Sequence, residues 1–154
     1  MKRALLISVL SLLAATGLRA QNVALGERVP ELKSVEWLDG AAPAAAPLTY
    51  IEFFHSSNSE ALRSLDRLKE TVEALGGRLR AVVVMRERTE RALAMVAPYR
   101  SGRIGVAYDA DGRIFDAFGV TYVSFGVLTD AKNRALWMGN TLRITPDFIE
   151  QTVQ

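Results

Sequence analysis

The 154-residue sequence has no cysteine and a single histidine, His55. The absence of cysteine excludes disulfide bonds, metal sites with cysteine ligands and any thiol nucleophile. With one imidazole, a histidine-based metal centre is hard to build, and we expect neither a metal nor a cofactor. The charged fraction of 23% and the hydrophobic fraction of 49% are typical of a globular protein.

The first 20 residues have the pattern of an export signal. A short basic start, Met1 to Arg3, precedes an apolar run over residues 4–15 and a processing region that ends at Ala20. This run is shorter than the roughly 20 apolar residues that a membrane-spanning helix needs, which disfavours the alternative of an uncleaved anchor. We therefore predict a signal peptide over residues 1–20, cleavage after Ala20, and a periplasmic or secreted protein with no stable membrane anchor.

The charge of the chain depends on this segment. The whole sequence has a formal charge of +2 and a pI of about 9.1, but Lys2, Arg3 and Arg19 lie in the predicted signal. Residues 21–154 hold 16 basic and 17 acidic side chains, so their net charge is −1. This balance gives no reason to expect a nucleic-acid partner. The arginines between positions 86 and 103 are interleaved with Glu87 and Glu90, which is typical of a solvated helix face.

Residues 21–154 alternate between two hydrophobic patterns. Runs that are apolar at nearly every position, such as Leu48 to Phe54, predict strands that are covered on both faces, and apolar side chains at steps of three or four predict amphipathic helices. Gly76 and Pro98 end the first two helices, and Thr145 is the expected N-cap of the last one. The expected strands are 35–38, 48–54, 79–85, 104–108, 125–129 and 135–138, and the expected helices are 60–75, one that ends near 97, 114–118 and 146–153. This order favours one α/β domain with a mixed sheet, long enough to form its core without crosslinks.

Two segments resemble motifs of a known family. The residues from Phe53 to Ala61 align without a gap with Phe-Trp-x-x-Trp-Cys-x-x-Cys, which follows the first central strand in exported thioredoxin-like proteins of the TlpA/ResA type. Residues 119–130 resemble that family's Gly-Val-x-x-Val-Pro-Thr-x-x-Leu-Ile-Asp. The resemblance implies a thioredoxin-like three-layer α/β/α domain with a central mixed sheet over residues 21–154, in a family of thiol–disulfide oxidoreductases.

Three reactive positions of that family are occupied by other residues here. Asn58 and Ala61 stand at the two cysteine positions, and Ser124 stands where the family has a cis proline that contacts the substrate cysteine. Thiol–disulfide exchange requires a thiolate, so oxidoreductase activity of the family's kind is excluded by the absence of cysteine. Without the proline, we expect a trans peptide bond before Ser124.

The resemblance also places Glu52 at the position of a buried acid that handles protons for the family's buried cysteine. Two environments are open for this residue. Either its carboxyl group is desolvated and has a raised pKa, or the carboxylate reaches solvent or pairs with a lysine or arginine.

His55 is followed by three serines and Asn58 within four positions. A hydrolase would need His55 as a base, one serine as a nucleophile and a carboxylate that orients the imidazole. Neighbouring side chains at a strand end diverge, so His55 and Ser56 are poorly placed to meet. The simpler interpretation is that the serines and Asn58 bind the free N–H groups at the start of a helix.

These observations predict a redox-inactive binding or assembly module with a protein or peptide partner in the cell envelope, and we do not expect an enzyme. The candidate binding residues, which surround the former dithiol position, are Phe54, His55, Ser57, Asn58, Tyr122, Val123, Ser124 and Trp137. Two alternatives stay open. One is a non-redox enzyme that uses Glu52 and His55 at that position, and the other is an accessory partner of an active thiol–disulfide oxidoreductase.

Overall fold

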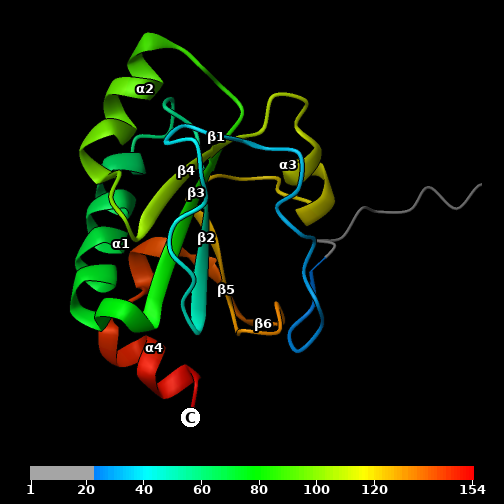
Figure 1. Cartoon of the computed structure of the whole chain (residues 1–154), viewed down its shortest axis with the longest axis vertical. Helices are drawn as coiled ribbons and strands as arrows, with labels where there is room; N and C mark the ends of the chain where they lie inside the picture. Colours follow the sequence, from blue (N-terminus) through cyan, green and yellow to red (C-terminus); the bar gives the residue numbers. More distant parts are fainter. Residues whose placement is uncertain (1–22) are drawn as a thin grey trace, which may run out of the picture.

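A mixed β-sheet organises the structure, a computed structural model that describes residues 23–154 (Figure 1). Its strands are β1 (Glu36–Trp37), β2 (Leu48–Phe54), β3 (Leu79–Met85), β4 (Ile104–Tyr108), β5 (Phe125–Thr129) and β6 (Ala135–Asn140). They lie in the order β1-β4-β3-β2-β5-β6. The pairs β2–β3 and β3–β4 are parallel, and the pairs β1–β4, β2–β5 and β5–β6 are antiparallel. The predicted signal peptide lies outside the described residues, and within them no helix is long and apolar enough to cross a membrane.

Helices cover both faces of the sheet, so the molecule has three layers (Figure 1). The helices are α1 (Ala61–Leu75), α2 (Glu90–Val96), α3 (Arg113–Phe118) and α4 (Pro146–Thr152). One face packs against α1, α2 and α4 through a core that includes Leu68, Val96 and Ile149. The other face packs against α3 and the segment that contains Val23 and Val29. The expected three-layer α/β/α arrangement with a mixed sheet is confirmed.

The bounds expected from the sequence agree closely with the structure. Thr145 caps α4 as predicted, because its hydroxyl accepts the Phe148 N–H at 3.1 Å. An unforeseen cap begins α2, where the Thr89 hydroxyl accepts the Ala92 N–H at 3.1 Å. β6 extends beyond the expected end to Asn140, since its antiparallel pairing with β5 continues to Phe125, the first residue of that strand. No cis peptide bond occurs in residues 23–154, so the expected trans bond before Ser124 is confirmed.

A glycine in β5 makes room for a buried tyrosine in the middle of the sheet. Tyr50 is fully buried, and its hydroxyl lies 2.8 Å from the Thr141 hydroxyl. Gly126 lies beside Tyr50, and a Cβ atom at Gly126 would fall 2.0 Å from the Tyr50 hydroxyl oxygen. The absence of a side chain at Gly126 therefore permits Tyr50 to reach Thr141.

We predict that Gly126→Ala lowers the free energy of unfolding by about 1–3 kcal/mol, because the added methyl group overpacks the core against the Tyr50 ring. Urea denaturation measures this change. Gly77→Ala is the matched control, since a Cβ at Gly77 meets nothing within 4 Å and should leave stability nearly unchanged. Equal midpoints for the two variants would contradict the packing described for Tyr50.

Candidate functional site

The candidate site lies at the edge of the sheet where β2 ends and α1 begins. Phe54 lies opposite Met85 in the parallel pairing of β2 with β3, so the residues that follow these strands emerge side by side. Ser56 donates both its N–H and its hydroxyl to the Glu87 carboxylate, the hydroxyl at 2.9 Å. These bonds hold the segment that leads into α1 against the end of β3.

Three polar side chains, two of them at positions that the resemblance assigns to reactive groups, are hydrogen bonded together. Asn58 Nδ2 donates to Ser124 Oγ at 2.6 Å, and Ser124 Oγ lies 2.8 Å from Ser64 Oγ on α1. Ser64 and Ser124 are buried, and the Asn58 side-chain oxygen accepts the Glu60 N–H at 3.1 Å. We call Asn58, Ser64 and Ser124 the Ser124 network. It joins two sequence positions that the resemblance assigns to the first cysteine and the proline.

Ser124 has an uncommon backbone conformation. It comes immediately before β5, and its φ angle of 59° lies in the left-handed region that few residues other than glycine adopt. The Ser124 hydroxyl contacts two partners in this conformation. The network therefore helps to stabilise an otherwise unfavourable turn between α3 and β5.

Glu52 lies in a separate buried cluster with Tyr50 and Thr141. The Thr141 hydroxyl, which contacts Tyr50 on its other side, donates to Glu52 Oε2. Desolvation raises the pKa of Glu52 to about 8, although the Thr141 hydrogen bond lowers it, and burial also raises the pKa of Tyr50. None of the ion pairs in residues 23–154 involves Glu52. Of the two environments considered for Glu52, the structure contains the desolvated one.

His55 faces Glu87 and not Glu52. Its Nε2 atom lies 3.8 Å from Glu87 Oε2, and its Nδ1 atom accepts the Ser57 N–H at 3.1 Å and lies 2.7 Å from the Ser57 hydroxyl. As expected, Ser56 bonds elsewhere. Both contacts of Nδ1 come from Ser57, two positions on, which is the geometry of a turn closed by a side chain.

An open groove lies beside His55. Its volume is about 240 Å³, and its lining residues are His55, Ser57, Arg86, Phe115, Val120, Thr121, Tyr122 and Val123. We call it the Tyr122 groove, because Tyr122 is the large side chain exposed there, at 49%. A second hollow of about 380 Å³ shares the His55 and Arg86 walls and extends toward Glu87 and Asp111.

Four of the eight candidate binding residues line the Tyr122 groove, namely His55, Ser57, Tyr122 and Val123, while Asn58 and Ser124 lie in the Ser124 network. The structure does not bring the other two to the groove. Phe54 is buried in the core beneath α1. Trp137 packs between Tyr50 and Phe148, with ring centroids 6.4 and 5.4 Å away.

A larger hollow, of about 660 Å³, lies at the other end of β2. Its charged side chains already have partners: Arg80 donates to Thr49 and to a backbone carbonyl, Glu31 pairs with Lys33, and Asp130 pairs with Arg134. We therefore place the candidate site at the Tyr122 groove, where polar groups remain available.

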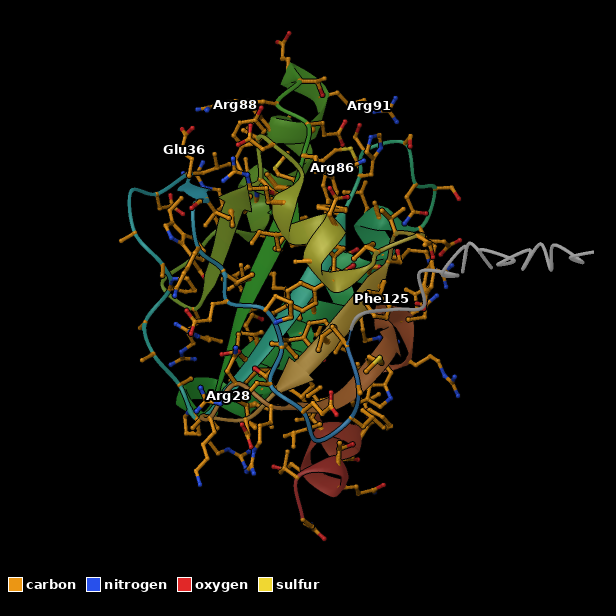
Figure 2. All side chains as sticks on the ribbon, turned by 90° about the vertical axis from the view of Figure 1, so that its right-hand side faces the viewer. Arg28, Glu36, Arg86, Arg88, Arg91 and Phe125 are labelled. Atoms are coloured by element: carbon orange, nitrogen blue, oxygen red, sulfur yellow. The ribbon has the colours of Figure 1, made fainter. Side chains whose placement is uncertain are left out.

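Arg86 and Glu87 belong to the site, although the sequence pattern predicted that they lie on a solvated helix face. They precede α2 and follow β3 directly, and Figure 2 shows Arg86 at the same end of the molecule as Arg88 and Arg91. The signal that could have found them is the parallel register of β2 and β3, which places residues after 85 beside residues after 54.

We predict that a disulfide forms in the double variant Asn58→Cys with Ala61→Cys. The Ala61 N–H donates to the Asn58 carbonyl at 3.1 Å, and such a four-residue turn holds its end Cα atoms within about 7 Å. A disulfide needs roughly 4.4–6.8 Å between these atoms. Mass spectrometry after oxidation and alkylation detects the bond. The control pair Asn58→Cys with Glu73→Cys, farther along α1, should not close within one chain; equal behaviour of the two pairs would refute the turn geometry.

We predict that Glu52→Gln removes a pH dependence of stability. The unfolded chain releases the Glu52 proton near the ordinary pKa of 4.5, whereas the folded protein retains it to about pH 8. The free energy of unfolding should therefore fall as pH rises between these values, by roughly 1.4 kcal/mol for each unit of difference in pKa.

Urea denaturation at both ends of this pH range measures the effect. The variant should lose the fall, because glutamine carries no proton that titrates. Glu70→Gln, at an exposed position of α1, is the control and should keep the wild-type profile. A Glu52→Gln profile identical to wild type would contradict the buried, protonated state.

Comparison with known proteins identifies the fold. No family model matches the sequence, and no curated protein matches it. The thioredoxin domain of a thiol-disulfide oxidoreductase from Bacteroides vulgatus superposes with a TM-score of 0.67 at 14% identity, over 86% of this chain and 99% of that one. A protein from Chlorobium tepidum proposed to be the thiol:disulfide interchange protein DsbE gives 0.70 at 17% identity, over 85% and 96%. StoA from Bacillus subtilis gives 0.60 at 12% identity, over 78% and 94%.

These similarities confirm the predicted thioredoxin-like fold. Identities this low carry no statement about activity. The chain is thus a thioredoxin-like α/β protein without cysteine, in which Asn58 and Ser124 of the Ser124 network stand at two of the positions that the sequence resemblance assigns to reactive groups.

Proposed function

We propose that this chain is an exported thioredoxin-like module without redox activity that binds a polypeptide in the Tyr122 groove. The observation that carries the proposal is the Ser124 network. Asn58 and Ser124 hydrogen bond to each other at positions where the resembling family has a thiol and a proline. Neither side chain can exchange a disulfide, while the groove beside them stays open.

The loop that forms one wall of the groove supports a polypeptide as the ligand. Among residues 23–154, the backbone N–H and C=O groups of Thr121, Tyr122 and Val123 have no hydrogen-bonding partner. An extended peptide can satisfy such groups with its own backbone while its side chains enter adjacent pockets. The mixture of apolar walls and free backbone groups fits a peptide better than a small apolar molecule.

Tyr122 supplies the apolar contact surface. Its ring packs edge-on against Phe125 with centroids 5.3 Å apart, and half of the side chain remains exposed. Tyrosine is frequent at interfaces because a rigid ring gives a large contact area and its hydroxyl can stay hydrated. A ring fixed from one side is suited to receive a partner on the other.

Export is a further part of the proposal. It rests on the basic start, short apolar run and small-residue end of residues 1–20, and it implies a periplasmic or secreted location. The alternative of a non-redox enzyme that uses Glu52 and His55 together has less support, because Glu52 bonds to Thr141 while His55 contacts Ser57 and Glu87.

We predict that Tyr122→Ala weakens peptide binding about tenfold, the loss typical of a central aromatic contact. The probes are short acetylated and amidated peptides selected from a random library on the purified wild-type protein, and fluorescence polarisation measures their dissociation constants. Val153→Ala removes a similarly exposed apolar side chain near the C-terminus and should leave binding unchanged. Selection of no peptide, or equal affinities for the two variants, would refute the proposal.

A further inference from the structure

We infer that the Tyr122 groove selects a polypeptide that carries a carboxylate, which the Arg86 guanidinium binds; this inference rests on the proposed function. Arg86 lines both the Tyr122 groove and the adjacent hollow. It makes no hydrogen bond or ion pair with any of residues 23–154. Arg88, two positions on, pairs with Glu36 at 2.7 Å, so a nearby arginine is neutralised while Arg86 is left available.

The acidic side chains near Arg86 are directed elsewhere. Glu87 accepts two hydrogen bonds from Ser56. Asp109 is buried and accepts the N–H groups of Ile114 and Phe115 at the start of α3. Asp111 lies 3.5 Å from Arg113. The positive charge of Arg86 is therefore not compensated by an ion pair within the described part of the chain.

The guanidinium of Arg86 is also held in place. It lies over the Phe115 ring, 4.8 Å from the centroid. A Cβ atom at Gly112 would come within 3.2 Å of Arg86 Cδ and Nη1, so the side chain runs close over this glycine. A guanidinium stacked on a ring keeps its N–H donors free at the edge, where they match the two oxygens of a carboxylate. Such fixed placement reduces the entropy lost on binding.

The composition of the groove favours an anionic ligand. No aspartate or glutamate is among its lining residues, whereas Arg86 supplies a positive charge and Ser57 and Thr121 supply hydroxyl groups. Phe115, Val120 and Tyr122 add apolar surface next to these donors. A peptide that carries a carboxylate can use both the charged and the apolar surface of the groove. The carboxylate binds Arg86, while a neighbouring side chain of the peptide packs against Tyr122.

The test uses the library peptides selected on the wild-type protein. Each acidic position is replaced by its amide, Asp by Asn and Glu by Gln, and each peptide is also made with a free C-terminal carboxylate. These arms distinguish a side-chain carboxylate from a C-terminal one. We expect the affinity of a peptide to depend on one of its carboxylates. We also expect Arg86→Gln to weaken binding of that peptide about 3- to 10-fold, as for a partly exposed charge-assisted pair.

Two variants make the result specific. Arg91→Gln removes the same charge from an exposed position on α2 and should leave affinity unchanged. Arg86→Lys keeps the charge but loses the planar donor pair, so intermediate affinity is expected. In a double-mutant comparison, the amide peptide should bind wild type and Arg86→Gln equally.

The outcomes separate this inference from the proposed function. Peptides that bind through Tyr122 but are indifferent to their carboxylates and to Arg86→Gln would overturn the inference and leave the proposed function standing. Absence of any binding peptide would overturn both. If phosphatidylglycerol vesicles bind the protein in an Arg86-dependent way and no peptide binds, the inference is also overturned, because the ligand would then be a lipid surface.

Discussion

The hydrogen bonds from Asn58 and Ser64 to Ser124 connect the start of α1 with the start of β5, and the rest of the site is arranged around this connection. A left-handed backbone costs a residue with a side chain roughly 1–2 kcal/mol. Two hydrogen bonds that contribute about 1 kcal/mol each can offset that cost. The position of the loop that carries Tyr122 thus depends on polar contacts, where the resembling family has a proline and thiols.

A second buried polar group lies in the sheet itself. Glu52 lies in β2 between Tyr50 and Phe54, and Gly126 opposite it leaves space for the Tyr50 hydroxyl. With no cysteine in the chain, Glu52 has no thiol to protonate or deprotonate. Its burial raises its pKa, so we expect the stability of the fold to depend on pH. The groove proposed to bind a partner lies elsewhere, beyond the end of β2, where His55 and Ser57 form part of its wall.

The fold could be read from the sequence because its signals are local. The apolar runs that form β2, β3 and β4 have few other ways to be buried, and Thr145 followed by proline is an unambiguous helix start. The site was harder to predict, because it depends on long-range pairing and on side-chain direction. Glu87 meets Ser56 across 31 positions through the register of two strands.

Side-chain direction also decided which aromatic residues reach the groove. Phe54 belongs to the β2 face that packs on α1, and Trp137 to the face covered by α4, so both aromatic rings are committed to the core. Ser57, and not Ser56, meets His55 because the chain turns after the strand.

The place where a partner binds can be mapped by the amide chemical shifts of the protein, followed by NMR during a peptide titration. We expect the largest shifts at 55–58, at Arg86 and at 121–124. Shifts confined to the far end of the molecule, around Leu48 and Ile149, would contradict binding in the Tyr122 groove.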